Sequence, residues 1–395
     1  MMKTSDFEYD LPQELIAQEP AAVRDRCRLL MMDRKTGALR DRIFRDIIEE
    51  IGPGDLVVVN ETRVMPARLL GVKRGTGGAA EVFLLREVLG REPHTAHSAL
   101  WEVLVRPGKR LKPGAGAGVP ASAAGAGAMD ASVSNAGGMS ASGTSASANP
   151  IVDFRAADGS VALSAEIIDW AADEQKGGRI ARLTTQMPSL DEALHAVGHT
   201  PLPPYIKDYA GDEELYQTVY SRRESSAAAP TAGLHFTPEL IAELQNHGVL
   251  WETVELEVGL DTFRVVDEDN PADHIMHTEF YTVPQRTVNA IRKTKERGHR
   301  VIAVGTTSMR SLESAWDAEA GELRARDREQ TSLFILPGYE FKVVDALITN
   351  FHVPRSTLMM LVSAFSSRDH IMNAYEHAIA ERYRLLSFGD AMYIG

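Results

Sequence analysis

The sequence has one cysteine, no long apolar run and no excess of basic residues. A single thiol, Cys27, excludes an internal disulfide and leaves no pair of thiolates for redox chemistry or a zinc site. No segment approaches the roughly 18 apolar residues that a membrane span needs, and the acidic N-terminal segment 1–14 does not have the pattern of a signal peptide. We therefore expect a cytoplasmic protein that has no membrane segment.

The formal net charge is −13. This charge argues against a protein that coats nucleic acid nonspecifically, because such binding depends on lysine and arginine neutralising phosphates. Two local basic clusters occur, at 106–112 and 291–300, and each one read alone is typical of a solvated surface. The length of 395 residues is sufficient for two domains, and 44% hydrophobic with 25% charged residues is typical of a soluble globular protein.

The pattern of apolar runs predicts an α/β fold interrupted by a small antiparallel β-barrel. Strand-like and helix-like segments alternate in residues 1–65 and again in 188–395, which together predict one discontinuous domain. Residues 66–187 instead contain short apolar runs between glycine-rich turns, as expected of an inserted barrel domain. Within the insert, residues 114–149 are mostly Ala, Gly and Ser, and they are predicted to form a disordered surface loop.

The stretch AAAPTAGLHFT leads a run of small residues into His235, just before a predicted helix that begins at Thr237 and Pro238. Small residues let backbone amides approach a ligand closely, and a helix N-terminus favours an anion or a polar group. The stretch therefore offers Thr231 and Gly233 for substrate binding and His235 for acid–base chemistry. A tight turn whose histidine bonds to the backbone would have the same pattern.

A second polar stretch follows the strand-like run RVIAVG. Thr306 and Thr307 lie in a predicted turn, 305–308, which is followed by a predicted helix that carries Arg310. Hydroxyls and amides at the carboxyl end of a strand are typical of the ligand crevice of an α/β sheet, although helix capping would also explain them. The stretch lacks the Walker lysine and the three-glycine fingerprint, so neither a nucleotide triphosphatase nor a nicotinamide enzyme is indicated.

Three further polar residues lie near predicted strand ends. Asn350 and His352 follow the strand-like run VVDALIT, and Asp390 follows a glycine turn in LLSFGDAMYIG. Each has an ordinary interpretation as a turn or cap residue. Their clustering with the preceding stretches favours substrate binding.

The segment HIMHTEFY brings together His274, His277 and Glu279. The spacing does not match the helical zincin pattern, which needs histidines four apart with the glutamate directly after the first. Acid–base chemistry or ligand hydrogen bonding is favoured over metal binding, because histidine titrates near neutrality and glutamate can set its tautomer.

Taken together, the sequence resembles the S-adenosylmethionine:tRNA ribosyltransferase-isomerase (QueA) family of queuosine biosynthesis. The resemblance spans residues 6–394 apart from the low-complexity stretch. It is carried by the runs DFEYDLPQELIAQEP, PGDLVVVNETRV, PLPPYI, LYQTVYS, APTAGLHFT, DHIMHTE, VIAVGTTSMRSLESA, PGYEFKVVDALITNFHVPRSTLMMLVSAF and FGDAMYI.

The resemblance implies the predicted fold and a specific reaction. The ribosyl part of S-adenosylmethionine would be transferred to 7-aminomethyl-7-deazaguanine at the wobble position of a tRNA and rearranged, giving epoxyqueuosine and releasing adenine and methionine. S-adenosylmethionine would be consumed as a cosubstrate, without a resident cofactor or metal. This chemistry needs a base near the carbon beside the sulfonium and an acid for the departing adenine.

The site prediction assigns each residue to one of three roles. We predict catalytic roles for His235, His277 and Glu279. We predict substrate binding by Thr231, Gly233, His274, Thr306, Thr307, Arg310, Asn350, His352 and Asp390. We predict tRNA binding by Arg106, Lys109, Arg110 and Lys112, and we expect a monomer.

The sequence departs from the family pattern at two places. Asp261 stands where family members generally carry Gly or Ala, and the Ala/Gly/Ser-rich loop is not part of the usual pattern. Two other functions stay open at this stage. One is a metal-dependent hydrolase built on His274, His277 and Glu279, and the other is a tRNA-binding module that keeps the fold without the reaction.

Overall fold

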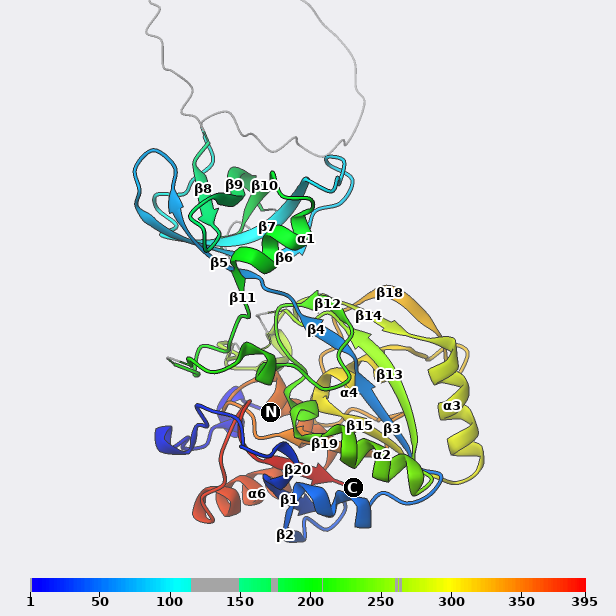
Figure 1. The fold of residues 1–395 in the computed structure, drawn as a ribbon. Helices are drawn as coiled ribbons and strands as arrows, with labels where there is room; N and C mark the ends of the chain where they lie inside the picture. The colour runs from blue at the N-terminus through cyan, green and yellow to red at the C-terminus, as the bar shows by residue number, and fades with distance from the viewer. Residues whose placement is uncertain (1, 115–148, 172–176, 208, 260–261, 263–264) are drawn as a thin grey trace, which may run out of the picture. The chain divides into compact units, whose positions relative to one another are not determined.

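The computed structural model describes residues 2–114, 149–171, 177–207, 209–259, 262 and 265–395. The chain forms two compact units, Met1–Met65 with Thr200–Gly395, and Pro66–His199 (Figure 1). The predicted mixed α/β fold with an inserted barrel is confirmed. The second boundary lies at 199/200, whereas the sequence analysis placed it at 187/188. Asp261 and nearly all of the predicted loop 114–149 lie outside the described residues.

The smaller unit is a closed antiparallel barrel of six described strands, in which the first strand pairs with the last. Around the barrel these are β5 (Arg68–Lys73), β6 (Ala79–Glu87), β7 (Ser98–Arg106), β10 (Arg179–Thr184), β9 (Val161–Trp170) and β8 (Ile151–Arg155). Alternate residues along β9 are buried, as expected of strands with one face toward a core. The helix α1 (Leu190–Val197) and the short strand β11 (Gly198–His199), which pairs with β5, also belong to this unit.

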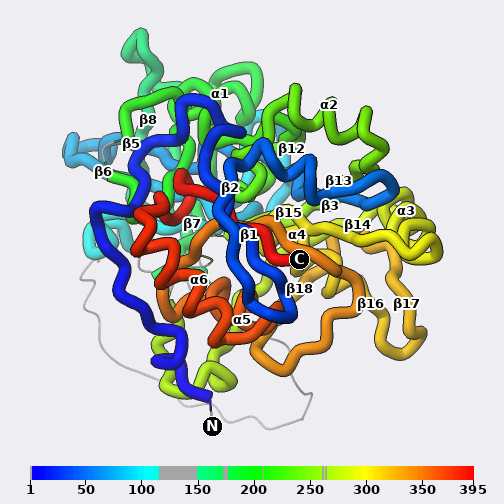
Figure 2. The backbone as a smooth tube through the Cα atoms, turned by 90° about the horizontal axis from the view of Figure 1, so that it is seen from below, coloured from blue at the N-terminus to red at the C-terminus, as the bar shows by residue number. Residues whose placement is uncertain are grey.

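Within the described residues, the larger unit is built on a nine-stranded mixed sheet. In spatial order the strands are β18 (Arg326–Thr331), β14 (Glu279–Val283), β13 (Leu250–Leu256), β3 (Leu56–Asn60), β15 (Val301–Val304), β19 (Ala346–Asn350), β20 (Ala391–Ile394), β1 (Arg28–Met32) and β2 (Leu39–Ile43). The strands β13, β3, β15 and β19 are parallel to one another. The strand β20 lies between β19 and β1, and Figure 2 shows the C-terminus beside β1.

Helices cover both faces of this sheet. They are α2 (Pro238–Asn246), α3 (Gln285–Glu296), α4 (Gly305–Ser314), α5 (Thr357–Phe365) and α6 (Arg368–Ala380), with 3₁₀ helices η1 (Thr4–Phe7), η2 (Gln13–Leu15), η3 (Arg24–Arg26), η4 (Phe44–Glu49), η6 (Glu213–Tyr216), η7 (Thr231–His235) and η9 (Pro271–Asp273). On β3, Val58 packs into a core shared with α3 to α6, whereas Val57 and Val59 pack into a core shared with η4 and α2. Burial on both faces explains the continuous apolar runs of the central strands.

The shorter elements of the larger unit form two additional small sheets. The parallel pair joins β4 (Thr62–Val64) to β12 (Arg223–Ser226), and the hairpin joins β16 (Trp316–Asp317) to β17 (Glu322–Leu323). A membrane crossing would need a longer and more apolar helix than any in the described part of the chain.

Replacing residues 116–148 with a short linker is expected to leave the melting temperature within about 2 °C. The flanking residues are already joined, because the amide of Gly114 donates to Oδ1 of Asn149 at 2.9 Å. Closing a shorter loop there costs little entropy. Calorimetry on the full-length and shortened chains measures the difference. A fall of more than 5 °C would show that the segment stabilises the fold.

Candidate active site

A pocket in the larger unit lies where three parallel strands end. Val258 follows β13, Gly305–Thr307 follow β15, and residues 349–353 form the end of β19 and the loop after it. Segments 229–232 and 386–387, together with Tyr205 and Thr262, line other parts of the pocket. This position corresponds to the usual ligand crevice of an α/β sheet.

The N-terminus of α4 forms one wall of the pocket. Gly305 has a φ angle of +86°, a conformation that favours glycine. The N-cap residue is Val304, whose side chain makes no capping hydrogen bond. The first amides of α4 are therefore left for a ligand. The hydroxyl of Thr307 is buried and has no hydrogen-bond partner among the described residues, so it too suits a bound polar group.

A chain of hydrogen bonds runs from the pocket into the core. The hydroxyl of Thr231 donates to Oδ1 of Asn350 at 3.0 Å, and Nδ2 of Asn350 donates to Nε2 of His235 at 3.1 Å. The contact of Nδ2 with the carbonyl of Leu386 at 3.4 Å fixes this orientation, because a carbonyl can only accept. On the other side of the imidazole, Nδ1 lies 3.2 Å from the sulfur of Cys27. His235 therefore lies one layer behind the pocket.

The environment of His235 keeps its imidazole neutral. Burial, assisted by the charges of Arg24 and Arg384, lowers the pKa of His235 to about 3. Since Nε2 accepts from Asn350, the ring proton lies on Nδ1, toward Cys27. Burial also raises the pKa of the Cys27 thiol, which stays protonated. Proton transfer by His235 stays a prediction, and it would require the contact with Asn350 to open.

Gly233 is confined by packing. A Cβ atom at this position would lie 1.8 Å from the hydroxyl of Tyr220 and 2.9 Å from a methyl group of Thr218. The glycine therefore allows the 3₁₀ helix η7 to approach these side chains. Its predicted contact with substrate stays untested, since the residues that line the pocket from this segment are Ala229 to Ala232.

Glu279, on β14, is buried behind the lining residue Thr262. Its Oε1 accepts from the amide of Gly259 at 3.0 Å and lies 3.4 Å from the hydroxyl of Thr262. Its Oε2 accepts from Nη1 of Arg310, and Nε2 of His277 lies 3.3 Å from Oε1. Burial alone would raise the pKa of Glu279, but the charge of Arg310 and the contacts with His277 and Gly259 lower the pKa to about 2. The ionised carboxylate therefore orients this wall of the pocket.

His274 has a different partner from His277. Its Nδ1 lies 2.9 Å from Oε2 of Glu268, and its ring lies edge-on to Phe334. Among the described residues, the ligand atoms of His274, His277 and Glu279 do not gather within the 4.8 Å that a shared metal ion would need. The geometry therefore does not support the metal-dependent hydrolase.

Asp390 holds the loop that brings Leu386 and Ser387 to the pocket. Its Oδ1 accepts from the amide of Arg28 at 2.9 Å, and its Oδ2 accepts from the amide of Arg384 at 2.7 Å. Burial raises the pKa of Asp390, and these amide bonds partly oppose the rise. The carboxyl group acts on the pocket through the backbone of this loop.

His352 lines the pocket and is held on three sides. Its Nε2 lies 2.8 Å from the hydroxyl of Thr349, its carbonyl accepts from Tyr9 at 2.6 Å, and its amide donates to the hydroxyl of Tyr375 at 2.8 Å. Burial lowers the pKa of His352 to about 3, so the imidazole is neutral at pH 7.

Sequence reasoning missed Tyr205 and Ser387 as lining residues. The two hydroxyls are 2.7 Å apart, and burial raises the pKa of Tyr205. Tyr205 lies in the run PLPPYI, which carried the family resemblance, and Ser387 directly precedes the run FGDAMYI, but neither segment has a spacing that indicates a pocket. Tyr205 and Ser387 are 182 residues apart in the sequence, and only folding brings their hydroxyls together at the pocket.

The predicted tRNA-binding residues lie in the smaller unit, at the end of β7 and just after it. Arg106, Lys109, Arg110 and Lys112 are all exposed. Arg106 lies 3.9 Å from Glu81 with its side chain 85% exposed, so this ion pair neutralises little of its charge.

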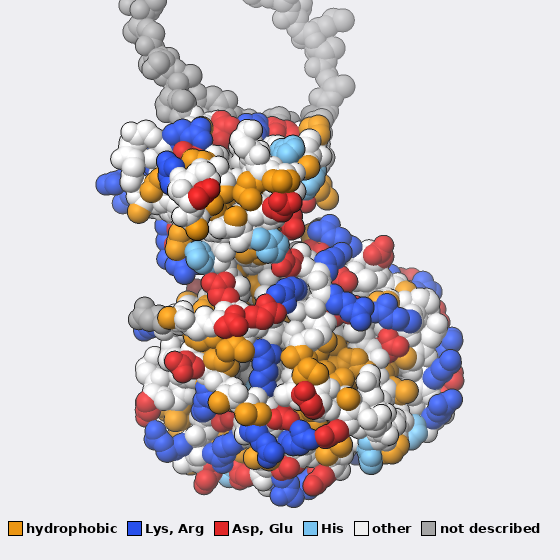
Figure 3. Space-filling model, viewed as in Figure 1, with side chains coloured by type: hydrophobic (Ala, Val, Ile, Leu, Met, Phe, Trp, Pro, Cys, Tyr) orange, Lys and Arg blue, Asp and Glu red, His pale blue; other side chains and the backbone are white. Residues whose placement is uncertain are grey.

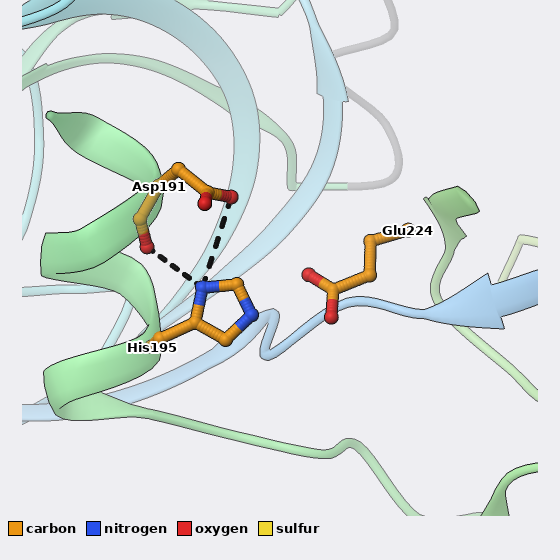
Figure 4. A group of neighbouring side chains, drawn as sticks. All are labelled: Asp191, His195 and Glu224. Carbon is orange, nitrogen blue, oxygen red and sulfur yellow. Dashed lines mark hydrogen bonds and ion pairs between the residues drawn. The ribbon is translucent and has the colours of Figure 1, made fainter. Parts of the chain in front are cut away.

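A histidine that the sequence analysis did not select lies on α1 of the same unit. Nδ1 of His195 donates to the carbonyl of Asp191 at 2.8 Å and lies 3.7 Å from a carboxylate oxygen of that residue (Figure 4). Glu224, also drawn there, belongs to the larger unit. Asp191 and His195 are four residues apart, and such pairs are common on exposed helix faces.

Comparison with known proteins shows similarity along the whole chain. Residues 4–394 match the family described as queuosine biosynthesis protein. The chain is 46% identical over 393 residues to the S-adenosylmethionine:tRNA ribosyltransferase-isomerase of Acetivibrio thermocellus, with 100% of both chains covered. It is 36% identical to S-adenosylmethionine tRNA ribosyltransferase from Thermotoga maritima in its crystal structure, covering 99% of this chain and 100% of that one with a TM-score of 0.48.

Proposed function

Because the chain belongs to the queuosine biosynthesis protein family, we propose that it transfers the ribosyl group of S-adenosylmethionine to 7-aminomethyl-7-deazaguanine at the wobble position of a tRNA. The ribosyl group is isomerised in the reaction, which gives epoxyqueuosine and releases adenine and methionine. The proposal rests on the 46% sequence identity, over 393 residues, to an S-adenosylmethionine:tRNA ribosyltransferase-isomerase. The pocket at the carboxyl ends of the parallel strands offers the polar groups that such a cosubstrate needs.

In this proposal, S-adenosylmethionine binds in this pocket as a consumed cosubstrate. The uncapped amides of α4 suit the methionine carboxylate, because a helix N-terminus favours an anion. Thr231, Thr307 and Asn350 offer hydrogen bonds to ribose or adenine. Lining residues such as Val258 and Phe351 exclude water from the bound molecule. No resident cofactor is needed for this reaction.

Some of the other predicted residues act in this proposal through the pocket wall. Glu279, with Arg310 and His277, orients the segment that includes Thr262, and Asp390 holds the loop of Ser387. His274 and Gly233 stay predicted substrate contacts. The monomeric state and the cytoplasmic location also stay predictions.

The tRNA would be bound by local basic clusters, since the overall charge is negative. Figure 3 shows Lys and Arg side chains interspersed with Asp and Glu over the viewed face. On α3, Lys295 is 2.8 Å from Asp345 and therefore partly neutralised. The exposed cluster of Arg106, Lys109, Arg110 and Lys112 is the stronger candidate for phosphate contacts.

Charge reversal of Lys109 and Arg110 to glutamate is expected to raise the KM for tRNA about tenfold at low salt, because phosphate neutralisation supplies much of the affinity. The KM for S-adenosylmethionine should stay within about twofold, since its pocket belongs to the larger unit. Steady-state kinetics at two salt concentrations measures both constants. The matched control reverses the exposed Lys35 and Arg42, which gives the same change in net charge. Equal effects of the two double variants would show that the cluster has no specific role.

Adenine release tests the proposed function directly. The purified protein is incubated with S-adenosylmethionine and a tRNA that carries 7-aminomethyl-7-deazaguanine, and the nucleosides are analysed by mass spectrometry. We expect adenine, methionine and epoxyqueuosine in equal amounts. Binding of the tRNA without adenine release would instead support a noncatalytic tRNA-binding module.

A further inference from the structure

We propose that His352 is the base of this reaction and that it accepts the proton through Nδ1. The inference rests on the proposed function and adds the residue that starts the chemistry. It differs from the sequence prediction, in which His235, His277 and Glu279 were the catalytic residues and His352 only bound substrate.

The composition of the pocket narrows the choice of base. Among the described lining residues, the ionisable side chains are those of His352 and Tyr205. Burial raises the pKa of Tyr205, so its phenol keeps its proton and cannot accept another at neutral pH. The imidazole of His352 is neutral at that pH and carries a lone pair.

The hydrogen bonds of His352 indicate which nitrogen is available. In the tautomer whose ring proton is on Nε2, this nitrogen donates to the hydroxyl of Thr349 at 2.8 Å, and the bond fixes the ring orientation. Nδ1 then carries the lone pair, and no hydrogen bond joins it to any described residue. His235 differs in this respect, because both of its ring nitrogens contact Asn350 or Cys27.

Glu279 is a weaker candidate for the base. Its carboxylate is occupied by Arg310, by the amide of Gly259 and by the hydroxyl of Thr262. Both carboxylate oxygens already accept hydrogen bonds from these partners, whereas Nδ1 of His352 accepts none from the described residues. Glu279 is also absent from the lining of the pocket in the described residues.

The proposed step conserves atoms and electrons. Nδ1 takes a proton from the carbon that joins the ribosyl group to the sulfonium sulfur. The electron pair of that bond stays on carbon, so the sulfonium becomes a neutral ylide and the imidazole becomes an imidazolium. When adenine departs with the electron pair of its glycosidic bond, the ribosyl carbon left behind forms an oxocarbenium ion with the ring oxygen. The imidazolium returns its proton to adenine and becomes neutral again, so the positive charge is then on the ribosyl group.

The low pKa of His352 is compatible with this step, because the step transfers the positive charge of the sulfonium to the imidazole and adds no new charge. Burial disfavours an imidazolium that forms by taking a proton from bulk water. With S-adenosylmethionine bound, the pocket already holds the positive charge of the sulfonium. Transfer from the adjacent carbon moves that charge to the ring without adding a second one, so the total charge in the buried pocket is unchanged.

Two substitutions test the assignment. His352→Gln can place its amide near the Nε2 position, toward Thr349, and loses the Nδ1 lone pair. His352→Asn can place its amide near the Nδ1 position, where an amide is not a base. Folding is measured by circular dichroism, S-adenosylmethionine binding by calorimetry, and adenine release by single-turnover kinetics. His247→Gln, at an exposed histidine after α2, is the matched control.

We expect both His352 variants to fold, the Gln variant to bind S-adenosylmethionine within about threefold of wild type, and both to release adenine at least about 10²-fold more slowly. A folded variant that keeps its rate within tenfold of wild type would overturn the assignment. A rate loss that equals the loss of cosubstrate affinity would also overturn it, since that is the result of a structural role. If the unaltered protein releases no adenine, the proposed function itself fails, which is a separate outcome.

Discussion

Replacing Arg310 with methionine is expected to lower the free energy of unfolding of the larger unit by about 3–5 kcal/mol. Arg310 and Glu279 are both buried and share a charge-assisted hydrogen bond. Removing one partner leaves the other charge buried without compensation, which is among the most destabilising single changes. Urea unfolding followed by circular dichroism measures the loss, and hydrogen exchange assigns it to β14 and α4.

The double variant Glu279→Gln with Arg310→Met is the control for this prediction. Its buried groups are neutral, and the glutamine can still accept from the amide of Gly259, so most of the lost stability should return. A double variant as unstable as Arg310→Met would show that packing of the arginine, not its charge, stabilises the site.

The pH dependence of stability gives a second readout of the same pair. The pKa of Glu279 is about 2 in the folded protein and about 4.3 in an unfolded chain. A depressed pKa contributes stability that is fully present above about pH 5 and is lost as the pH falls toward 2. In Arg310→Met this contribution should shrink, so the decline between pH 5 and 3 should be shallower than in the unaltered protein. An unchanged slope would contradict the low pKa.

Asn350→Leu is expected to lower kcat/KM for S-adenosylmethionine about 10²-fold. Asn350 lines the pocket and joins Thr231, His235 and the carbonyl of Leu386. Leucine has a similar volume but makes none of these bonds, so the pocket wall loses its fixed geometry. A displacement of about 1 Å between the reacting groups can reduce the rate of an enzymatic reaction by about 10²-fold. The same substitution at the exposed Asn246, at the end of α2, should leave kcat/KM unchanged.

The double variant that combines His235→Ala with Asn350→Leu tests how His235 contributes to turnover. If His235 moves a proton itself, His235→Ala should reduce turnover about 10²-fold or more, and the loss should add to that of Asn350→Leu. If it only orients Asn350, the double variant should be no slower than Asn350→Leu alone. Near-normal turnover of His235→Ala would show that His235 has only a structural role, in which it packs against Cys27.

The location of the pocket could be predicted from the sequence because the central strands are short continuous apolar runs, each followed by polar residues. The runs before Thr306 and Asn350 end at the same edge of a parallel sheet, and such edges bind ligands. This reasoning uses only the local order of apolar and polar residues along the chain, which predicts where each strand ends. It identified Thr231, Thr306, Thr307, Asn350 and His352, all of which line the pocket.

The depth of each residue could not be predicted in the same way. His235 and Glu279 lie in motifs as distinctive as that of His352, yet each is separated from the pocket by a lining residue. Whether a side chain lies in the first or the second layer depends on packing between separate segments, which are 115 residues apart for His235 and Asn350 and 17 residues apart for Glu279 and Thr262. The four-residue strand β20 was missed for a related reason, since AMYI is too short to be distinguished from a closing turn.

The position of β20 has a consequence for how the protein is made. A ribosome releases β1 and β2 early, but β1 meets its parallel neighbour only when residues 391–394 have been synthesised. Until then the apolar side chains of Leu29 and Met31 have no completed sheet to pack in. Premature termination before Ala391 would leave both β1 and β19 with an unpaired edge, which is a signal for chaperones and proteases. Synthesis of β20 therefore decides whether β1 is held in a completed sheet.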